Sequence, residues 1–137
     1  MGDFRVDAVK RAVNSLGWSC ESYDESQSQL IVNANGTWYI SFADKKEIKV
    51  NVPVMEIPAK ILFSGMIPTL LQLTNEKCSY VKFDQMSEYI IACSAISSSI
   101  FLRTDNETEL KEDLMAMHNE MVAGTRALES FISRLLD

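Results

Sequence analysis

Apolar residues recur at alternating steps of three and four along the last third of the chain, the spacing of one face of a helix. At the start of this stripe Thr104 and Glu107 form a capping box, and Asn106 with Glu109 fits almost as well. The spacing predicts one long amphipathic helix from about Thr104 onwards. The residues of its buried face are Leu110, Leu114, Met117, Met121, Gly124, Leu128, Phe131 and Leu135.

The beginning of the chain shows the same spacing and predicts a first amphipathic helix. Gly17 stands where a residue in the left-handed conformation closes a helix. Trp18 follows, where an apolar contact back to the last turn is usual. The apolar positions of this helix are Val6, Val9, Val13 and Leu16.

Three short strands are predicted next, because three segments are rich in β-branched and aromatic residues. Asn35 and Gly36 separate the first two segments and predict a hairpin, since a type I′ turn needs positive φ at both central positions. Pro53 has no N–H, so it places its end of the third strand at a sheet edge or past the strand's limit. The three segments are 30–32, 37–42 and 48–54.

The middle of the chain predicts a short helix and a second hairpin. Residues 61–66 fit either one helical turn or a packed loop. A short buried helix is predicted from Ser64 or Pro68, closed by Asn75, a residue that tolerates the left-handed region. Two further strands are predicted to pair with each other, over residues 80–84 and 88–95. The apolar residues of the short helix are Ile67, Leu70, Leu71 and Leu73.

The predicted elements follow the order α-β-β-β-α-β-β-α, which is the arrangement of an α+β domain. The polar and acidic segment 20–29 is interpreted as a strand start that runs into a loop. We therefore expect a single domain over residues 1–137, with a five-stranded antiparallel sheet and helices on one face. The other face, or an edge of the sheet, remains for a partner.

Composition narrows the classes of partner. The formal net charge of −6 opposes a phosphate backbone, so we expect no nucleic-acid partner. No stretch approaches the length of a membrane span, so no membrane partner is expected. The three cysteines share no metal-binding or disulfide spacing, and the N-terminus lacks the layout of a secretory signal. These features predict a reduced, cytoplasmic protein.

The order of elements resembles the type III secretion chaperone-like fold, and within it looks closest to the YbjN-like group, described as proposed sensory transduction regulators of bacteria. The residues that carry the resemblance begin with the helix Leu70-Leu71-Gln72-Leu73-Thr74-Asn75. Strands at 79–84 and 88–93 and the terminal helix follow. The resemblance implies a small acidic cytoplasmic protein of bacteria, commonly dimeric, that binds other proteins and catalyses nothing. The serine-rich link at 97–99 departs from the secretion-chaperone pattern.

Catalytic chemistry is not indicated by the sequence. The only histidine, His118, falls within the long helix, where a side chain is more often packed or solvated than catalytic. No phosphate-binding loop, dinucleotide fingerprint or set of metal ligands occurs, so no enzyme, cofactor or metal is expected. A carboxylate-based enzyme, using pairs such as Asp84 and Glu88, is the least favoured of three functional hypotheses, after the two described next.

The methionines of the long helix indicate an interaction surface. Met117 and Met121 fall in the buried stripe, whereas Met115 stands off it, seven residues before Val122. We predict protein interaction through Met115, His118 and Val122, in a homodimer that binds a protein client or regulatory partner. The alternative is a carrier of small apolar ligands that uses a pocket between helices and sheet. The aromatic residues that motivate this alternative are Trp38, Phe42, Phe63 and Phe83.

Overall fold

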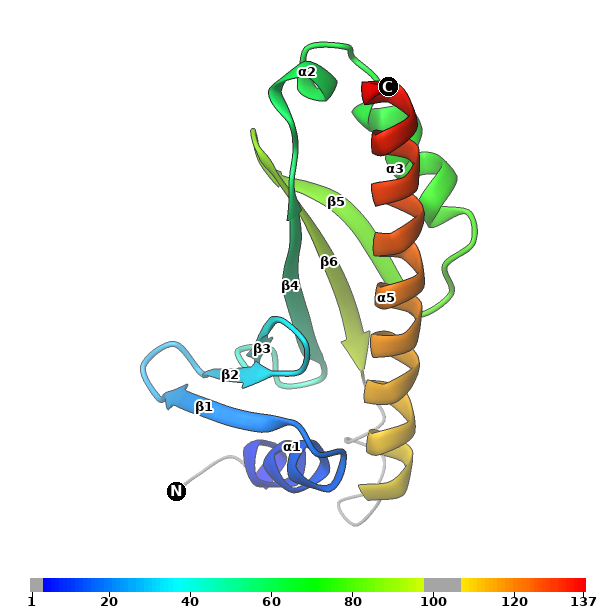
Figure 1. Ribbon diagram of the computed structural model, residues 1–137. Coiled ribbons are helices and arrows are strands. Elements are labelled where there is room, and N and C mark those ends of the chain that lie inside the picture. Colours follow the sequence, from blue (N-terminus) through cyan, green and yellow to red (C-terminus); the bar gives the residue numbers. More distant parts are fainter. Residues whose placement is uncertain (1–3, 98–106) are drawn as a thin grey trace.

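The computed structural model describes residues 4–97 and 107–137 (Figure 1). Within these residues the elements are α1 (Phe4–Ser15), β1 (Ser19–Asp24), β2 (Gln29–Asn33), β3 (Thr37–Ser41), β4 (Ile48–Glu56), α2 (Ala59–Leu62), α3 (Ile67–Asn75), β5 (Val81–Ser87), β6 (Ile90–Ser97) and α5 (Glu107–Leu136). The predicted capping residues Thr104 and Asn106, and residues 98 and 99 of the serine-rich link, lie outside the described residues.

The sheet formed by the described residues has six antiparallel strands in the order β1-β2-β3-β4-β6-β5. The α+β class is confirmed. The five-strand prediction and its element order are wrong, because the described elements run α-β-β-β-β-α-α-β-β-α. The additional strand is β1, which was predicted only as a strand start within 20–29. It is an edge strand with a bulge between Cys20 and Ser22 and four exposed residues among six. Such a strand lacks the alternation that identifies one face as buried.

The helices pack against one face of the sheet (Figure 1). The long helix α5 runs beside the sheet, with α1 next to its N-terminal half and α2 and α3 near its C-terminal half. Alternate residues of a strand point to opposite faces of the sheet. In β4, Ile48, Val50 and Val52 are therefore buried under the helices, while Lys49 and Asn51 on the other face are exposed.

The end of α1 matches its prediction. Gly17 adopts φ +80°, and its N–H donates to the carbonyl oxygen of Asn14 at 3.1 Å. The N–H of Trp18 donates to the carbonyl oxygen of Val13 at 3.0 Å. These two bonds form a Schellman motif, which satisfies carbonyl groups that the helix itself leaves unpaired. The chain then turns directly into β1.

The hairpin predicted between β2 and β3 is also confirmed, but the predicted type I′ turn is wrong, because that turn has two connecting residues and this connection has three. Asn35 and Gly36 adopt φ values of 58° and 145°, in a three-residue connection that joins the paired residues Asn33 and Thr37. Pro53 lies inside β4, which continues to Glu56, so it does not end the strand. Pairing with β3 stops at Asn51, however, and from there β4 is a sheet edge on that side. Pro53 therefore lies beyond the pairing with β3, and its missing N–H costs no hydrogen bond to that strand.

The apolar segment after β4 forms one helical turn, α2, and α3 follows. The N-cap of α3 is Met66, rather than Ser64 or Pro68. Asn75 is the last helical residue, not a left-handed terminator, because the C-cap Glu76 also has helical φ and ψ. Leu73 is 42% exposed, whereas Thr74 is buried and donates a hydrogen bond to the carbonyl oxygen of Leu70. The apolar prediction for Leu73 is therefore wrong about its burial.

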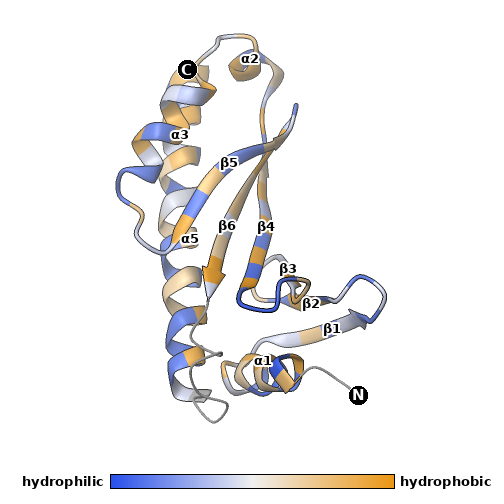
Figure 2. Cartoon of the chain, turned by 180° about the vertical axis from the view of Figure 1, so that it is seen from behind, coloured by the Kyte–Doolittle hydropathy of each residue, from blue (hydrophilic) through white to orange (hydrophobic). Residues whose placement is uncertain are grey.

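The buried stripe of α5 is confirmed over most of its length. It is buried at Leu110, Leu114, Met117, Met121, Gly124 and Leu128. Beyond these residues Phe131 is half-buried, Ile132 is buried, and Leu135 is 42% exposed, because the end of the helix extends past the sheet. Figure 2 shows this end of α5 beside α2, with apolar residues on both elements.

Candidate functional site

His118 lies in an aromatic cluster on one flank of α5. Its ring centroid is 5.3 Å from that of Trp18 and 6.1 Å from that of Trp38. The side-chain nitrogen of Asn35, on the β2–β3 connection, is 3.5 Å from His118 Nε2. Trp38 Nε1 and His118 Nδ1 are buried and have no hydrogen-bond partner among the described residues. The cluster therefore ties α5 to the end of α1 and to the β2–β3 hairpin.

The two other predicted interaction residues continue along this flank. Met115 and Val122 are both half-buried, as is His118. Val122 lines a cleft of about 330 Å³. The cleft lies between the β2–β3 connection, β4 and α5, and it is lined by Asn35, Gly36, Val52, Pro53, Val54, Met121, Val122, Thr125, Arg126 and Glu129. Its walls combine an apolar floor with polar groups, which is the composition of a binding surface.

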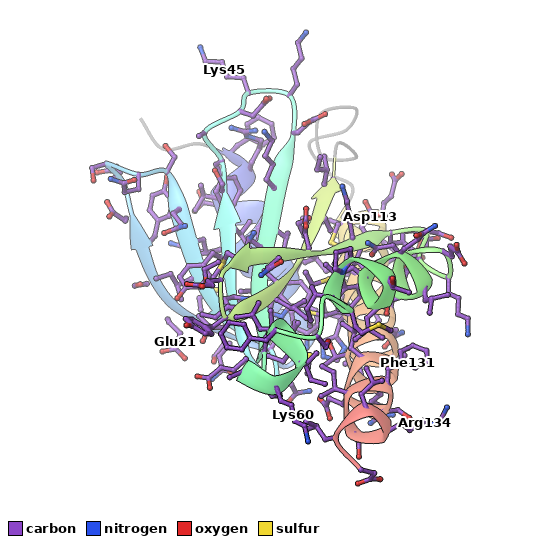
Figure 3. The ribbon with its side chains drawn as sticks, turned by 90° about the horizontal axis from the view of Figure 1, so that it is seen from above. Glu21, Lys45, Lys60, Asp113, Phe131 and Arg134 are labelled. Carbon is purple, nitrogen blue, oxygen red and sulfur yellow. The ribbon has the colours of Figure 1, made fainter. Side chains whose placement is uncertain are left out.

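A second depression lies on the opposite flank of α5, against α3. Its volume is about 180 Å³, and its lining includes Leu73, Ala123, Ala127 and Phe131. In Figure 3, Phe131 is labelled on α5, with Arg134 nearer the end of that helix. Gly124 also lines this depression. The ring of Phe83 occupies the space where any larger residue at position 124 would place its Cβ.

Cys78 lines this second depression, and Cys93 is buried in the core near Cys78. Burial raises the pKa of Cys78, and the neighbouring Glu120 carboxylate raises it further. Burial raises the pKa of Cys93 to about 12, with smaller contributions from Cys78 and Glu120. Thiols held in the protonated form are weak nucleophiles. These cysteines therefore favour a packing role over a catalytic one.

The side chains named in the enzyme and carrier hypotheses do not converge on a common cleft. Asp84 and Glu88 are both exposed, on or next to the β5–β6 hairpin. Of the aromatic residues, Trp38, Phe42 and Phe83 are buried in the core, whereas Phe63 is 81% exposed. Within residues 4–97 and 107–137, no three His, Cys, Asp or Glu side chains gather where they could hold a metal ion.

Three polar residues have roles that the sequence does not reveal. Arg5 is buried, and its guanidinium donates to the carbonyl oxygens of Asp44 at 2.7 Å and Phe42 at 2.9 Å. Asn75 and Glu120 bond to the main chain around β5. Each contact joins positions that are far apart in sequence or in different elements, so no local sequence spacing predicts it. The only signal for Arg5 is its place next to Val6 on the apolar side of α1.

Comparison with known proteins identifies the fold. No protein-family model matches the chain, and no curated relative matches it. Solved structures do match, and one of them, from a chaperone–effector complex, shares the fold of this chain, as the resemblance to the type III secretion chaperone-like fold predicted.

One similar structure is a chain of the HopA1–SchA chaperone–effector complex, with a TM-score of 0.54 and 11% identity, covering 90% of this chain and 94% of that chain. Another is YbjN from E. coli, a proposed transcription regulator, with a TM-score of 0.46 and 15% identity, covering 86% of this chain and 93% of that chain. At these identities the likeness concerns the fold alone. Among the described helices, none has the length and apolar content needed to cross a membrane.

Proposed function

We propose that this chain is a non-enzymatic protein-binding module of the chaperone-like or regulatory kind, acting as a homodimer in the bacterial cytoplasm. The observation that carries the proposal is the fold, shared over 90% of the chain with a member of a chaperone–effector complex. The acidic net charge of −6 agrees with a partner other than nucleic acid.

Exposed apolar side chains support a protein partner. Large apolar or aromatic residues that are at least two-fifths exposed occur at several places in the described chain, among them α1, β5 and β6. Four of them lie on α3, after α2 and at the end of α5: Leu73, Phe63, Leu135 and Leu136. α2 and α3 both contact α5, so these residues gather toward one end of the molecule (Figures 1 and 2). Monomeric proteins seldom leave large contiguous apolar patches in water, and such patches commonly mark interaction sites.

The binding surface that we propose is the flank of α5 with Met115, His118 and Val122. The cleft beside Val122 has a floor of valine and methionine side chains. Arg126 and Glu129 line the same cleft and are exposed. An apolar centre within a polar rim is the usual anatomy of a protein–protein interface. The His118 cluster fixes one end of this surface, because the indole rings of Trp18 and Trp38 lie close to the imidazole.

The second candidate is a carrier of small apolar ligands. The depression between α3 and α5, with a volume of about 180 Å³, is below the roughly 300–1,000 Å³ of typical ligand pockets. The cleft beside Val122, with a volume of about 330 Å³, reaches only the lower end of that range. The aromatic residues that motivated this candidate fill the core or face solvent. Native mass spectrometry of the purified protein would support the carrier if a retained small molecule were observed. A spectrum that shows only the mass of the polypeptide would count against the carrier and favour the protein-binding module.

The main proposal is tested by the oligomeric state and by cross-linking from α5. Sedimentation equilibrium should give the mass of a dimer at tens of micromolar. Val122→Cys, labelled with benzophenone maleimide and irradiated in lysate, should cross-link to a second copy or to a client. Glu112→Cys, on an exposed part of the same helix, is the matched control. Unmodified protein gives the background from the three native cysteines.

Two results would contradict this proposal. A strict monomer at these concentrations would refute the homodimer. Equal cross-linking from Val122→Cys and Glu112→Cys would show that the flank with Val122 has no special affinity for protein. A specific cross-link to a client, combined with a monomeric mass, would retain the binding surface and remove the dimer.

A further inference from the structure

β5 is one edge of the six-stranded sheet, because β6 is its only neighbouring strand among the described residues. An edge strand presents unpaired N–H and C=O groups, which can pair with a strand of another chain. The backbone N–H and C=O groups of successive residues in β5 point alternately toward β6 and away from it. Those of Lys82 and Asp84 face β6, and those of Val81, Phe83 and Gln85 face outward. The outward groups decide whether another strand can be added here.

Asn75 occupies the outward groups of Phe83. Its side-chain oxygen accepts from the Phe83 N–H at 2.7 Å, and its side-chain nitrogen donates to the Phe83 carbonyl oxygen at 2.8 Å. A residue in a neighbouring antiparallel strand makes the same pair of bonds. The carboxamide at the end of α3 therefore takes the place that a strand from another chain would take.

The outward N–H groups on either side of Phe83 also have side-chain acceptors. Glu120 Oε1, on α5, accepts from the N–H groups of Tyr80 at 2.8 Å and Val81 at 3.0 Å. Asp84 Oδ1 accepts from the N–H of Gln85 at 2.8 Å. Every outward N–H from Val81 to Gln85 is thus bonded to a side chain. The elements that supply Asn75 and Glu120 lie along this edge of the sheet (Figure 1).

The opposite edge is restricted in a different way. The register of β1 against β2 shifts between Cys20 and Ser22. Glu21 stands in that bulge and is exposed, on the side of the molecule away from Phe131 (Figure 3). A bulge and an exposed charge each oppose the addition of a strand.

We propose that Asn75 and Glu120 act as guards of the β5 edge, which keep the sheet closed to strand addition by a second copy or by an extended segment. Association through the sheet edge then requires displacement of the Asn75 carboxamide, an event that the folded protein opposes with two hydrogen bonds. This inference does not depend on the proposed function, because it concerns how chains do not associate.

Hydrogen exchange of the unmodified protein tests the first part of the inference. Amide protons at an open sheet edge exchange much faster than those paired within the sheet. The N–H groups of Val81 and Phe83 should instead exchange about as slowly as those of Lys82 and Asp84. Exchange of the Phe83 N–H at the rate of an unprotected amide would overturn the proposal.

Substitution of Asn75 tests the second part. Asn75→Ala should speed exchange of the Phe83 N–H by roughly five- to tenfold, as expected for the loss of one ordinary hydrogen bond. It should also give concentration-dependent self-association. Asn75→Asp keeps an acceptor for this N–H and should give an intermediate result.

Thr74→Ala is the control for instability, since Thr74 is the neighbouring buried residue of α3 and does not bond to β5. Sedimentation equilibrium of both variants, at matched fractions folded by circular dichroism, separates an opened edge from general unfolding. Greater association of Asn75→Ala than of Thr74→Ala supports the guard. Equal association of the two variants refutes it, whatever the oligomeric state of the unmodified protein.

Discussion

The contact between Gly124 of α5 and Phe83 of β5 leaves no room for a side chain at position 124. A Cβ built on Gly124 would lie 2.5 Å from Phe83 Cζ and would overlap Cε2 as well. Phe83 is 1% exposed, so its ring has little free space into which it could move. Gly124→Ala, normally a favourable change inside a helix, should therefore destabilise this protein.

Two opposing effects set the magnitude. Replacement of a helical glycine by alanine stabilises a helix by about 0.8–1.0 kcal/mol. Insertion of a methyl group into a filled core costs about 1–3 kcal/mol, because side chains and backbone must shift. The contact at Gly124 is with the rigid ring of a buried aromatic residue, so we take the upper half of that range. The net expectation is a loss of about 1–2 kcal/mol in the free energy of unfolding.

Urea unfolding measures this loss, with the fluorescence of Trp18 and Trp38 and circular dichroism as probes. Ala123→Gly, at an exposed neighbouring position, isolates the helix-propensity effect. Phe83→Leu in the Gly124→Ala background should recover part of the loss, so the double-mutant cycle should show favourable coupling. Unchanged or increased stability of Gly124→Ala would refute the close packing of α5 on β5.

Three further results are expected. Arg5→Ala should lose about 2–4 kcal/mol, because the charged hydrogen bonds to the Phe42 and Asp44 carbonyls disappear. Arg5→Lys should not restore the loss, since an ammonium lacks the guanidinium fork; urea midpoints check both. Burial raises the pKa of Cys93 to about 12 from 9.0. Above about pH 9 the unfolded chain loses the thiol proton more readily than the folded chain, so the free energy of unfolding should fall as pH rises. Urea midpoints at neutral and alkaline pH, compared with those of Cys93→Ala, check the sign. Leu128→Asp should cost about 4 kcal/mol or more by placing a carboxylate at a fully buried position, and an unchanged melting temperature would show that another face of α5 is buried.

Local sequence rules were sufficient where neighbouring residues decide the conformation. The stripe of α5 depends only on helical periodicity, and it held until the helix extended past the sheet at Leu135. Gly17 and the pair Asn35 and Gly36 were correctly assigned positive φ, because glycine and asparagine tolerate that region with little strain. In each case the physical cause lies within a few residues of its effect.

Edge strands and long-range polar contacts escaped the same rules. β1 shows no alternating pattern, since its residues are mostly polar and four of the six are exposed. Arg5 sits on the apolar side of α1, where a charged residue is unexpected unless it is paired. Its carbonyl partners, Phe42 and Asp44, are 37 and 39 residues away, just after the end of β3, so only the folded chain brings them together.

The candidate interaction surface shows the same division. Helical spacing predicts that Met115, His118 and Val122 share one flank of α5, but it could not show that His118 would meet two indole rings. The other flank faces α3 and the guarded β5 edge, through Gly124 and Glu120. Because the guards and the β1 bulge oppose association through either sheet edge, a second copy or a client is left with side-chain contacts. The flank that begins at the His118 cluster offers such contacts beside a cleft of about 330 Å³, so disruption of Val122 should weaken association more than any change along β1.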